Sequence, residues 1–485
     1  MTLSAAEQYL IELINQSRLD PLTAASEQGI SLNNGVTAAM GGPLQTTPMQ
    51  VLAPNVQLEE AANAQSSYLL ESGNFGHAGR GGSTIHERII DVDYESPSTF
   101  RENLSFTQNS QSNMATIVEG HHGALYESAP HRAAIFDENQ SDIGIGLQSG
   151  DYRGRETSML VEVYGAQRGG SYVTGVAYAD RDRDDFYSLG EGISGVEFQA
   201  ANALASSAAA GGYALDASGS DTSVSILVDG TTISTLSIDT SDGNAKLDLI
   251  AQNGGGYSLA VSTDTTLQTG VNDAVLLGSG NLELTGHNGD NTLEGNRGNN
   301  ILRGSTGDDI LKGYAGRDKL KGGSGDDKLV GGDGYDKLLG NAGNDILKGG
   351  RNDDKLLGGS GDDLLKGGSG DDTLKGGRGD DLLKGGSGDD TLKGEAGNDI
   401  LRGGGGADTF VFTKGQDIIR DFQDNVDTIV VNRAMIDGTG STVDDLLSLG
   451  DIVNGNAVFD LSGSHQLIVQ GVSDLEDLRN DLIIG

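Results

Sequence analysis

The sequence predicts a multidomain protein that contains a right-handed parallel β-roll in its C-terminal part. Residues 286–411 are fourteen consecutive nine-residue repeats, and the chain before them changes from a helical pattern to a composition rich in Ser, Thr, Gly and Val. A chain of 485 residues is also too long for one ordinary core. We therefore expect separate parts at residues 1–168, 171–275, 286–411 and 412–485.

Composition excludes several classes of function. The formal net charge of -39 argues against nucleic-acid binding, because phosphates would be repelled. The absence of cysteine excludes disulfides, thiolate metal sites and cysteine nucleophiles. The first residues lack a basic region followed by an apolar run, so no cleavable signal peptide is expected, and no stretch approaches the length of a transmembrane segment.

The repeats have four fixed columns when they are counted from Gly286. Position 1 is always Gly, and position 4 is Gly in thirteen units and Asn352 in the other. Position 6 is Asp in twelve units, and position 8 is Leu in thirteen and Phe410 in the last. We expect the glycines to supply positive φ angles at tight turns. Each leucine should point inward from a strand of about three residues, which is stable only when successive turns stack.

Stacking would align the position-6 carboxylates, and aligned carboxylates with turn carbonyls suit a hard cation such as calcium. A Gly-, Asp- and Lys-rich disordered linker is the alternative, but a linker does not need leucine at a fixed phase. The repeats hold 23 acidic and 17 basic residues, so the calcium prediction depends on the pattern and not on charge. The predicted calcium ligands are Asp309, Asp318, Asp327, Asp336, Asp345, Asp354, Asp363, Asp372, Asp381, Asp390, Asp399 and Asp408.

The block resembles the RTX (hemolysin-type) nonapeptide G-G-x-G-x-D-x-U-x. The resemblance implies several calcium ions, folding that depends on them, and export in an unfolded state by type I secretion machinery. Asn291 and Asn300, at position 6 of the first two units, carry no charge and should bind calcium more weakly or act as a cap.

The tail should cover the last turn of the roll. Residues 415–422 and 427–431 are predicted strands, and they resemble the tail of the serralysin C-terminal region. The sequence ends Asp-Leu-Ile-Ile-Gly485, which is similar to type I secretion signals. We therefore expect residues 412–485 to form a β-rich cap that carries the signal.

Residues 1–168 show helical periodicity. Apolar residues at helical spacing, with Ser4 as a candidate N-cap, predict a helix over 5–17. Further helices are expected at 58–70 and 114–126.

This region resembles the cysteine-free bacterial branch of the CAP superfamily (cysteine-rich secretory, antigen 5, pathogenesis-related). The resemblance implies an α-β-α sandwich with a cleft that holds two histidines and acidic residues. The motifs that carry it are Asn15-x-x-Arg18, Phe75-Gly-His77, Arg101-Glu-Asn-Leu104, Glu127-Ser-Ala-Pro-His-Arg132, Asp142-Ile-Gly-Ile-Gly146 and Val161-Glu-Val-Tyr-Gly165.

The resemblance places His77, His131 and Glu102 in the cleft, with either Glu127 or Ser128 as the fourth member. These groups would suit Zn²⁺ or another divalent ion, or one carboxylate could orient an imidazole or act as a base. Glu119 is a further candidate for the second acid.

The remaining histidines of this region are weaker candidates. His121 and His122 face different directions on a helix and are expected to be structural. His86-Glu87 is not followed by a second histidine four residues after the first, so a zincin motif is absent.

Residues 171–275 have the composition of a small β-sandwich. Within them, Asp180, Asp182, Asp184 and Glu191 occupy positions 1, 3, 5 and 12 of an EF-hand-like calcium loop. Asp185 stands where that loop has glycine, and an acidic hairpin without metal is the alternative.

Together these features predict a secreted, extracellular calcium-binding protein whose cleft binds an extracellular lipid, peptide or surface ligand. A metal-dependent hydrolase that uses the cleft and a structural surface or matrix protein are the alternatives. The sequence lacks HExxH, GxSxG and a cysteine nucleophile, which argues against an enzyme.

Overall fold

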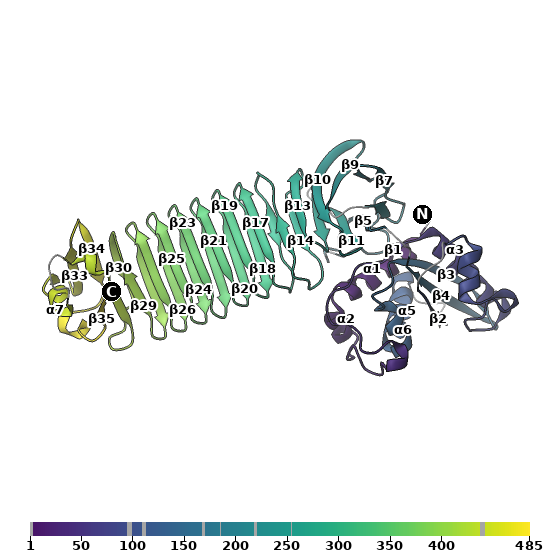
Figure 1. The fold of residues 1–485 in the computed structure, drawn as a ribbon, viewed down its shortest axis with the longest axis horizontal. Helices are drawn as coiled ribbons and strands as arrows, with labels where there is room; N and C mark the ends of the chain where they lie inside the picture. The colour runs from purple at the N-terminus through teal and green to yellow at the C-terminus, as the bar shows by residue number, and fades with distance from the viewer. Residues whose placement is uncertain are drawn as a thin grey trace. The chain divides into compact units, whose positions relative to one another are not determined.

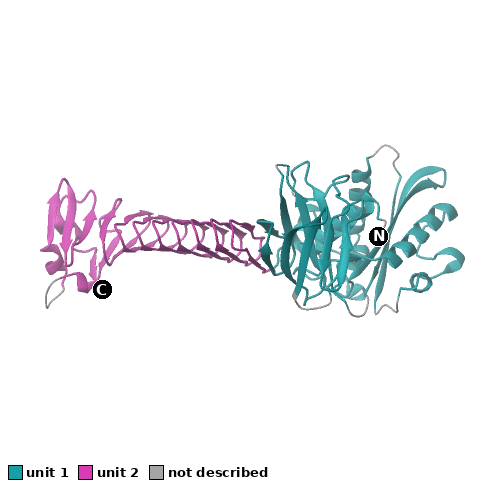
Figure 2. Ribbon diagram, turned by 90° about the horizontal axis from the view of Figure 1, so that it is seen from above, with its two compact units in different colours: residues 1–280 teal, residues 281–485 magenta. Residues whose placement is uncertain are grey.

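The computed structural model describes residues 3–94, 99–108, 113–166, 170–184, 186–217, 221–253, 255–436 and 442–485. The chain divides into two compact units, residues 1–280 and 281–485, which Figure 2 colours separately. None of the described helices has the length and apolar character that crossing a membrane requires.

The first part of unit 1 is an α-β-α sandwich around a four-stranded sheet of order β1-β3-β4-β2 (Figure 1). Strand β1 is parallel to β3, and the other neighbours are antiparallel. Alternate residues of the sheet join two buried clusters, one with α3 and α4 and the other with α1, α2, α5 and α6. The elements are α1 (Ala5–Leu19), α2 (Pro21–Glu27), η1 (Ala38–Met40), β1 (Ala53–Pro54), α3 (Val56–Ser72), η2 (Arg80–Gly82), α4 (Ile85–Asp91), β2 (Phe100–Thr107), α5 (Met114–Glu127), α6 (Ala129–Ile135), β3 (Asp142–Tyr152) and β4 (Arg155–Gly165).

The three helices expected from periodicity are present as α1, α3 and α5, each extended by a residue or more at one end or both. Ser4 caps α1 in a capping box with Glu7. Helix α3 lies directly on the backbone of β3, because a Cβ on Gly144 or Gly146 would overlap the main chain of that helix. The two glycines of this motif therefore set the distance between helix and sheet.

The second part of unit 1 is a β-sandwich, as its composition predicts. One sheet has the order β13-β10-β9-β6-β7 and the other β14-β12-β11-β5-β8. The strands are β5 (Tyr172–Ala179), β6 (Glu197–Ala200), β7 (Ala203–Ser206), β8 (Gly212–Asp216), β9 (Asp221–Val228), β10 (Thr231–Asp239), β11 (Ala245–Ala251), β12 (Tyr257–Val261), β13 (Thr265–Thr269) and β14 (Asp273–Leu276).

Both parts of unit 1 share one core. Val176 and Tyr178 of β5 belong to the same buried cluster as Leu10 of α1. Close by, the buried Lys246 of β11 forms an ion pair with Glu12 of α1 at 2.6 Å. The helical sandwich and the β-sandwich therefore form one compact body of about 280 residues.

Unit 2 is a parallel β-roll in which strands alternate between two sheets (Figure 1). Each strand pairs in parallel with the strand two places later, 18 residues further along the chain, so one turn contains two repeats. The position-8 leucines form the core, and none is more than 2 % exposed. The strands are β15 (Glu283–Thr285), β16 (Thr292–Glu294), β17 (Ile301–Thr306), β18 (Ile310–Ala315), β19 (Lys319–Ser324), β20 (Lys328–Asp333), β21 (Lys337–Ala342), β22 (Ile346–Arg351), β23 (Lys355–Ser360), β24 (Leu364–Ser369), β25 (Thr373–Arg378), β26 (Leu382–Ser387), β27 (Thr391–Ala396), β28 (Ile400–Gly405) and β29 (Thr409–Phe412).

Two details of the repeat differ from the prediction. Strands β17 to β28 are six residues long, because each continues from positions 7–9 of one unit through positions 1–3 of the next. No position-1 glycine of residues 286–411 lies in the left-handed region. Positive φ angles occur instead at positions 4 and 2. At position 2 they are adopted even by residues other than glycine, namely Ser305, Tyr314, Asn341 and Glu395.

Position 1 needs glycine for space. A Cβ on Gly367 would overlap Oδ2 of Asp372, and the same overlap recurs from Gly304 to Gly403. The glycine at position 1 therefore makes room for the carboxylate of its own repeat.

The tail covers the end of the roll as expected. Strand β30 (Gln416–Ile419) pairs with β28, and β31 (Thr428–Val431) pairs with β29. The last strand, β35 (Leu482–Ile484), pairs in parallel with β31, so the end of the sequence is part of a sheet. The remaining elements are η3 (Arg433–Met435), α7 (Val443–Leu447), β32 (Gly450–Val453), β33 (Asn456–Leu461), β34 (His465–Val469) and η4 (Leu475–Leu478).

Replacing Gly367 with alanine should destabilise the roll, because the new methyl group meets the Asp372 carboxylate. We expect a loss of about 1–3 kcal/mol, as for overpacked cores, measured by thermal unfolding of the full-length protein in calcium. Gly405→Ala is the control, since no atom lies within 4 Å of its added Cβ and its φ is not positive. Equal melting temperatures for the two variants would contradict this account of position 1.

Candidate functional site

The twelve predicted aspartates form a continuous ladder inside the roll. Each position-6 carboxylate accepts a hydrogen bond through Oδ1 from the backbone N–H of the position-6 residue one turn earlier. Asp309 N–H donates to Asp327 at 2.9 Å, and Asp390 N–H donates to Asp408 at 3.0 Å. Asn291 N–H begins one series by donating to Asp309 at 2.7 Å. One carboxylate oxygen per repeat therefore holds neighbouring turns in register.

The other oxygen of each carboxylate is left without a partner. All twelve side chains are buried, and every Oδ2 lacks a hydrogen-bond partner among the described residues. Each Oδ2 lies beside the space that the position-1 glycine leaves, and beside Gly385 that space also adjoins the carbonyl oxygen of Gly403. A carboxylate oxygen and a carbonyl oxygen facing one space are the ligands that calcium prefers. The residues present thus fit the predicted metal.

Burial raises the pKa of every carboxyl in this ladder. The pKa rises to about 6 for Asp309, about 7 for Asp318, and about 8 for Asp354 and Asp381. Desolvation is the main cause, the neighbouring aspartates add to it, and the backbone hydrogen bond opposes it. Without a cation, the buried carboxyls therefore hold a proton more strongly than exposed carboxyls do.

A second ladder lies on the exposed edges of the roll, and the sequence analysis missed it. It uses position 5, where eleven of the fourteen units have Asp or Asn. Its bonds run in the opposite direction: Asp380 N–H donates to Asp362 Oδ1, and Asn398 N–H donates to Asp380 Oδ1, both at 2.8 Å. The frequency of Asp and Asn at this position was the signal that could have revealed it.

The buried ladder also continues beyond the predicted repeats. Asp399 N–H donates to Asp417 at 3.1 Å, and Asp408 N–H donates to Asp427 at 3.0 Å. Asp417 follows Asp408 by nine residues, with Gly415 and Ile419 at positions 4 and 8 of a degenerate fifteenth unit. The nine-residue phase could therefore have predicted Asp417.

The acidic loop of unit 1 brings three of its four predicted ligands together. Single carboxylate oxygens of Asp180, Asp182 and Asp184 lie within 4.8 Å of one another. Glu191 is buried, and its two oxygens accept backbone N–H bonds from Arg181 at 2.6 Å and Ser188 at 2.9 Å. Glu191 thus closes the loop on itself, while the three aspartates face one another. Asp185 lies outside the described residues.

The cleft residues of the first part converge only partly. The side chain of Glu102, on β2, is 1 % exposed and contacts two groups: Oε2 lies 2.8 Å from Nδ1 of His77, and Oε1 forms an ion pair with Arg88 of α4. Arg88 also donates to the carbonyl of His77 at 3.1 Å. The hydrogen bond to Glu102 raises the pKa of His77. The sequence analysis did not include Arg88, which fixes both partners.

His131 is on α6, beside the edge strand β2. Asn103 donates to its carbonyl at 3.2 Å, and burial followed by the charge of His77 lowers the pKa of His131. The His77 side chain is 62 % exposed, so a ligand could reach this imidazole.

The candidates for the second acid lie apart from this pair. Glu127 is exposed at the end of α5, and Ser128 is the N-cap residue of α6. The Glu119 carboxylate accepts a hydrogen bond from the Tyr9 hydroxyl at 3.0 Å. Among the described residues, the cleft histidines and acids do not form a three-ligand cluster, so the geometry gives no support to Zn²⁺ there.

The other histidines of this region each contact a neighbouring side chain that is not a predicted cleft residue. His121 is buried between the hydroxyls of Ser105 at 2.9 Å and Ser158 at 3.1 Å. His122 lies 3.3 Å from the Ser17 hydroxyl, and His86 stacks on Phe100.

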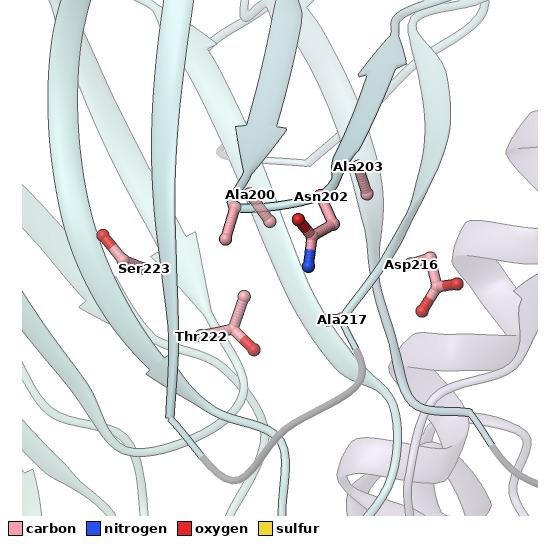
Figure 3. A pocket seen from close by; sticks show the side chains of 8 residues that line it. Ala200, Asn202, Ala203, Asp216, Ala217, Thr222 and Ser223 are labelled. Atoms are coloured by element: carbon pink, nitrogen blue, oxygen red, sulfur yellow. The ribbon is translucent and has the colours of Figure 1, made fainter.

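A separate pocket lies in the β-sandwich between the β6–β7 hairpin and the strands β8 and β9. Figure 3 shows Asn202, Asp216 and Thr222 around it. None of the predicted site residues lines this pocket.

The raised pKa values predict how acidity affects the calcium-free roll. The ladder carboxyls have pKa values of about 6 to 8 in the folded state, against about 3.9 when unfolded. Stability from their protonation is therefore fully present below about pH 4 and is lost as the pH rises through about 6 to 8. In calcium-free buffer, the β-sheet circular dichroism of the full-length protein should increase as the pH falls from 8 to 5. A roll most ordered at pH 8 without calcium would contradict this prediction.

Replacing Glu102 with glutamine should lower the pKa of His77, because the carboxylate that raises it is removed. A histidine-resolved NMR titration measures this directly. Glu127→Gln is the control, since it removes the same charge from an exposed position. If both variants moved the His77 titration equally, the effect would be general electrostatics and not the bond to Glu102.

Comparison with known proteins agrees with the resemblance to the CAP superfamily and with the resemblance to RTX repeats. Residues 11–164 match the cysteine-rich secretory protein family, and the RTX calcium-binding nonapeptide repeat matches five segments, some of them overlapping, that together cover residues 285–419. No curated protein matches the chain.

Among solved structures, the chain is similar to the extracellular lipase LipA from Serratia marcescens. The two are 21 % identical over 45 % of this chain and 41 % of the lipase, with a TM-score of 0.17. The chain thus spans less than half the length of that lipase. From the family matches and the fold, the chain contains a CAP domain within its first 165 residues, followed later by a block of RTX calcium-binding repeats.

Proposed function

We propose that the protein is secreted and binds calcium, that its roll folds on calcium outside the cell, and that it displays a CAP cleft to an extracellular ligand. The observation that carries this proposal is the row of twelve buried carboxylates, each with one oxygen that has no hydrogen-bond partner within the described parts of the chain. A buried carboxylate without compensation is costly in free energy. The roll therefore requires a cation or a proton in each repeat.

Calcium, when bound, supplies the positive charge that the ladder lacks. The RTX match supports this assignment. Calcium-poor cytosol would leave the carboxylates uncompensated and the glycine-rich chain unfolded, so type I secretion machinery could export it as an extended chain. Extracellular calcium, at about millimolar concentration, would then drive folding, because binding energy becomes folding energy.

The acidic loop is a second candidate calcium site. Asp180, Asp182 and Asp184 would supply carboxylate ligands from one short segment. Glu191 would act by holding the loop closed through the backbone amides of Arg181 and Ser188.

The cleft supports ligand binding better than hydrolysis. Both oxygens of Glu102 are engaged, so this carboxylate orients His77 and is not free to act as a base. The exposed imidazole of His77 offers a hydrogen-bonding group to an extracellular lipid, peptide or surface component.

Asp381→Asn tests the role of the ladder. Burial raises the pKa of Asp381 to about 8, so folding at neutral pH without calcium requires this carboxyl to take up a proton. Asparagine needs no proton, so in calcium-free buffer at neutral pH the variant roll should be more ordered than the wild type. In a calcium titration followed by circular dichroism, the folding midpoint should rise about three- to tenfold, on the order of 1 kcal/mol, because one ligand is lost.

Asp380→Asn is the matched control, since Asp380 is exposed and an asparagine Oδ1 could still accept its hydrogen bond from Asn398. Its calcium midpoint should stay close to that of the wild type. A wild-type roll that is fully folded in chelator at neutral pH would refute the proposed dependence on calcium.

A further inference from the structure

Within each repeat of the roll, basic and acidic side chains stand at different positions. Thirteen of the 17 basic residues of the repeat block stand at positions 7 and 9, which are the outward positions of the strands, while positions 8 and 1 are buried. From Ile301 to Arg402, no acidic residue occupies either outward position. The thirteen are Arg303, Lys312, Lys319, Lys321, Lys328, Lys337, Lys348, Lys355, Lys366, Lys375, Lys384, Lys393 and Arg402.

The sheet of even-numbered strands carries two parallel rows on its outer face. An aliphatic row and a cationic row cross β22, β24, β26 and β28 in strict register, so each member pairs with the next. Neighbours within a row are about 4.8 Å apart, the distance between adjacent strands. The aliphatic row is Ile346, Leu364, Leu382 and Ile400, and the cationic row is Lys348, Lys366, Lys384 and Arg402.

The lysines of the cationic row are available to a partner. Within residues 255–436, all of them described, no ion pair involves Lys348, Lys366 or Lys384. By contrast, Lys312 pairs with Glu294 and Lys393 pairs with Glu395. The aliphatic row beside them is partly open to solvent, and Ile346 is 37 % exposed.

Exposed aspartates of the position-5 ladder border this face. Asp362 and Asp380 lie in the turns before β24 and β26, and Asp371 and Asp389 lie in the turns after them. A flat anionic surface such as a membrane would meet these acidic edges as well as the cations. A single anionic chain lying along the rows would contact the cations and avoid the edges.

Calcium would change the sign of the roll's charge. The repeat block has 23 acidic and 17 basic residues, a net charge of -6. Four bound calcium ions would bring eight positive charges and make it positive, whereas the other residues of the chain keep a net charge of -33. The face would therefore attract anions once the ladder is loaded.

We propose that the outer face of the even-numbered sheet binds a linear acidic polysaccharide when calcium is present. The carboxylates of an extended acidic polysaccharide recur at regular intervals along one line, as the cations of the row do, so several charges of a single chain can pair with the row. The non-polar faces of its rings can pack on the aliphatic row. The calcium dependence of this binding rests on the proposed function.

The test measures binding of a fluorescent oligogalacturonate, short enough not to gel with calcium, to the full-length protein by anisotropy. The test variant combines Lys348→Gln, Lys366→Gln and Lys384→Gln, and the matched control combines Lys319→Gln, Lys337→Gln and Lys355→Gln on the odd-numbered sheet. Both variants lose three charges. In calcium, the test variant should bind the oligogalacturonate about tenfold more weakly than the wild type, and the control variant less than about twofold more weakly. The expected losses are small because each exposed ion pair contributes little free energy. Rising salt should weaken wild-type binding.

Equal loss in the two variants, or no binding by the calcium-folded wild type, would overturn the inference. Tighter binding to vesicles of anionic phospholipid, lost in the same test variant, would assign the face to membranes and also overturn it. Circular dichroism of the same samples separates the two proposals. A roll that folds on calcium but binds no oligosaccharide refutes only this inference, whereas a roll folded in chelator refutes the proposed function.

Discussion

The roll depends on a carboxylate that does two things at once. In twelve of the fourteen repeats, Oδ1 of the position-6 aspartate fastens one turn to the next, and Oδ2 is buried without a hydrogen-bond partner among the described residues. The same side chain therefore sets the 18-residue spacing and creates the demand for a cation. An apolar residue at this position would remove the charge and the hydrogen bond between turns together, whereas asparagine would keep an oxygen acceptor and remove only the charge.

Much of the roll could be predicted because its signal is periodic. The leucine and aspartate columns fixed which side chains point inward, and the structure agrees at every repeat. The reason for the position-1 glycine was wrong, since its cause is the space beside a carboxylate from the same repeat and not a backbone angle. The strand length was also underestimated, because positions 1–3 carry too few side chains to show the pattern of a strand. Spacing reveals phase, but contacts across turns appear only in three dimensions.

The cleft was predictable only as far as family motifs reached. They indicated His77, Glu102 and His131, but Arg88 belongs to none of them and decides what Glu102 can do. Glu127 lies in a motif and yet is exposed, because the helix ends there and its side chain turns to solvent. A local motif places a residue on an element. It does not say which distant side chain will occupy both of its oxygens.

The shared core of unit 1 limits how this protein can be divided or recombined. A fragment that ended after β4 would lose Lys246, the cation that pairs with Glu12 of α1, and would lose Val176 and Tyr178 from the apolar cluster that contains Leu10. The helical sandwich and the β-sandwich must therefore be inherited or transplanted as one cassette. The roll, by contrast, can be shortened or lengthened. Because its turns are nearly identical, it can gain or lose 18 residues at a time while each end keeps its own neighbours.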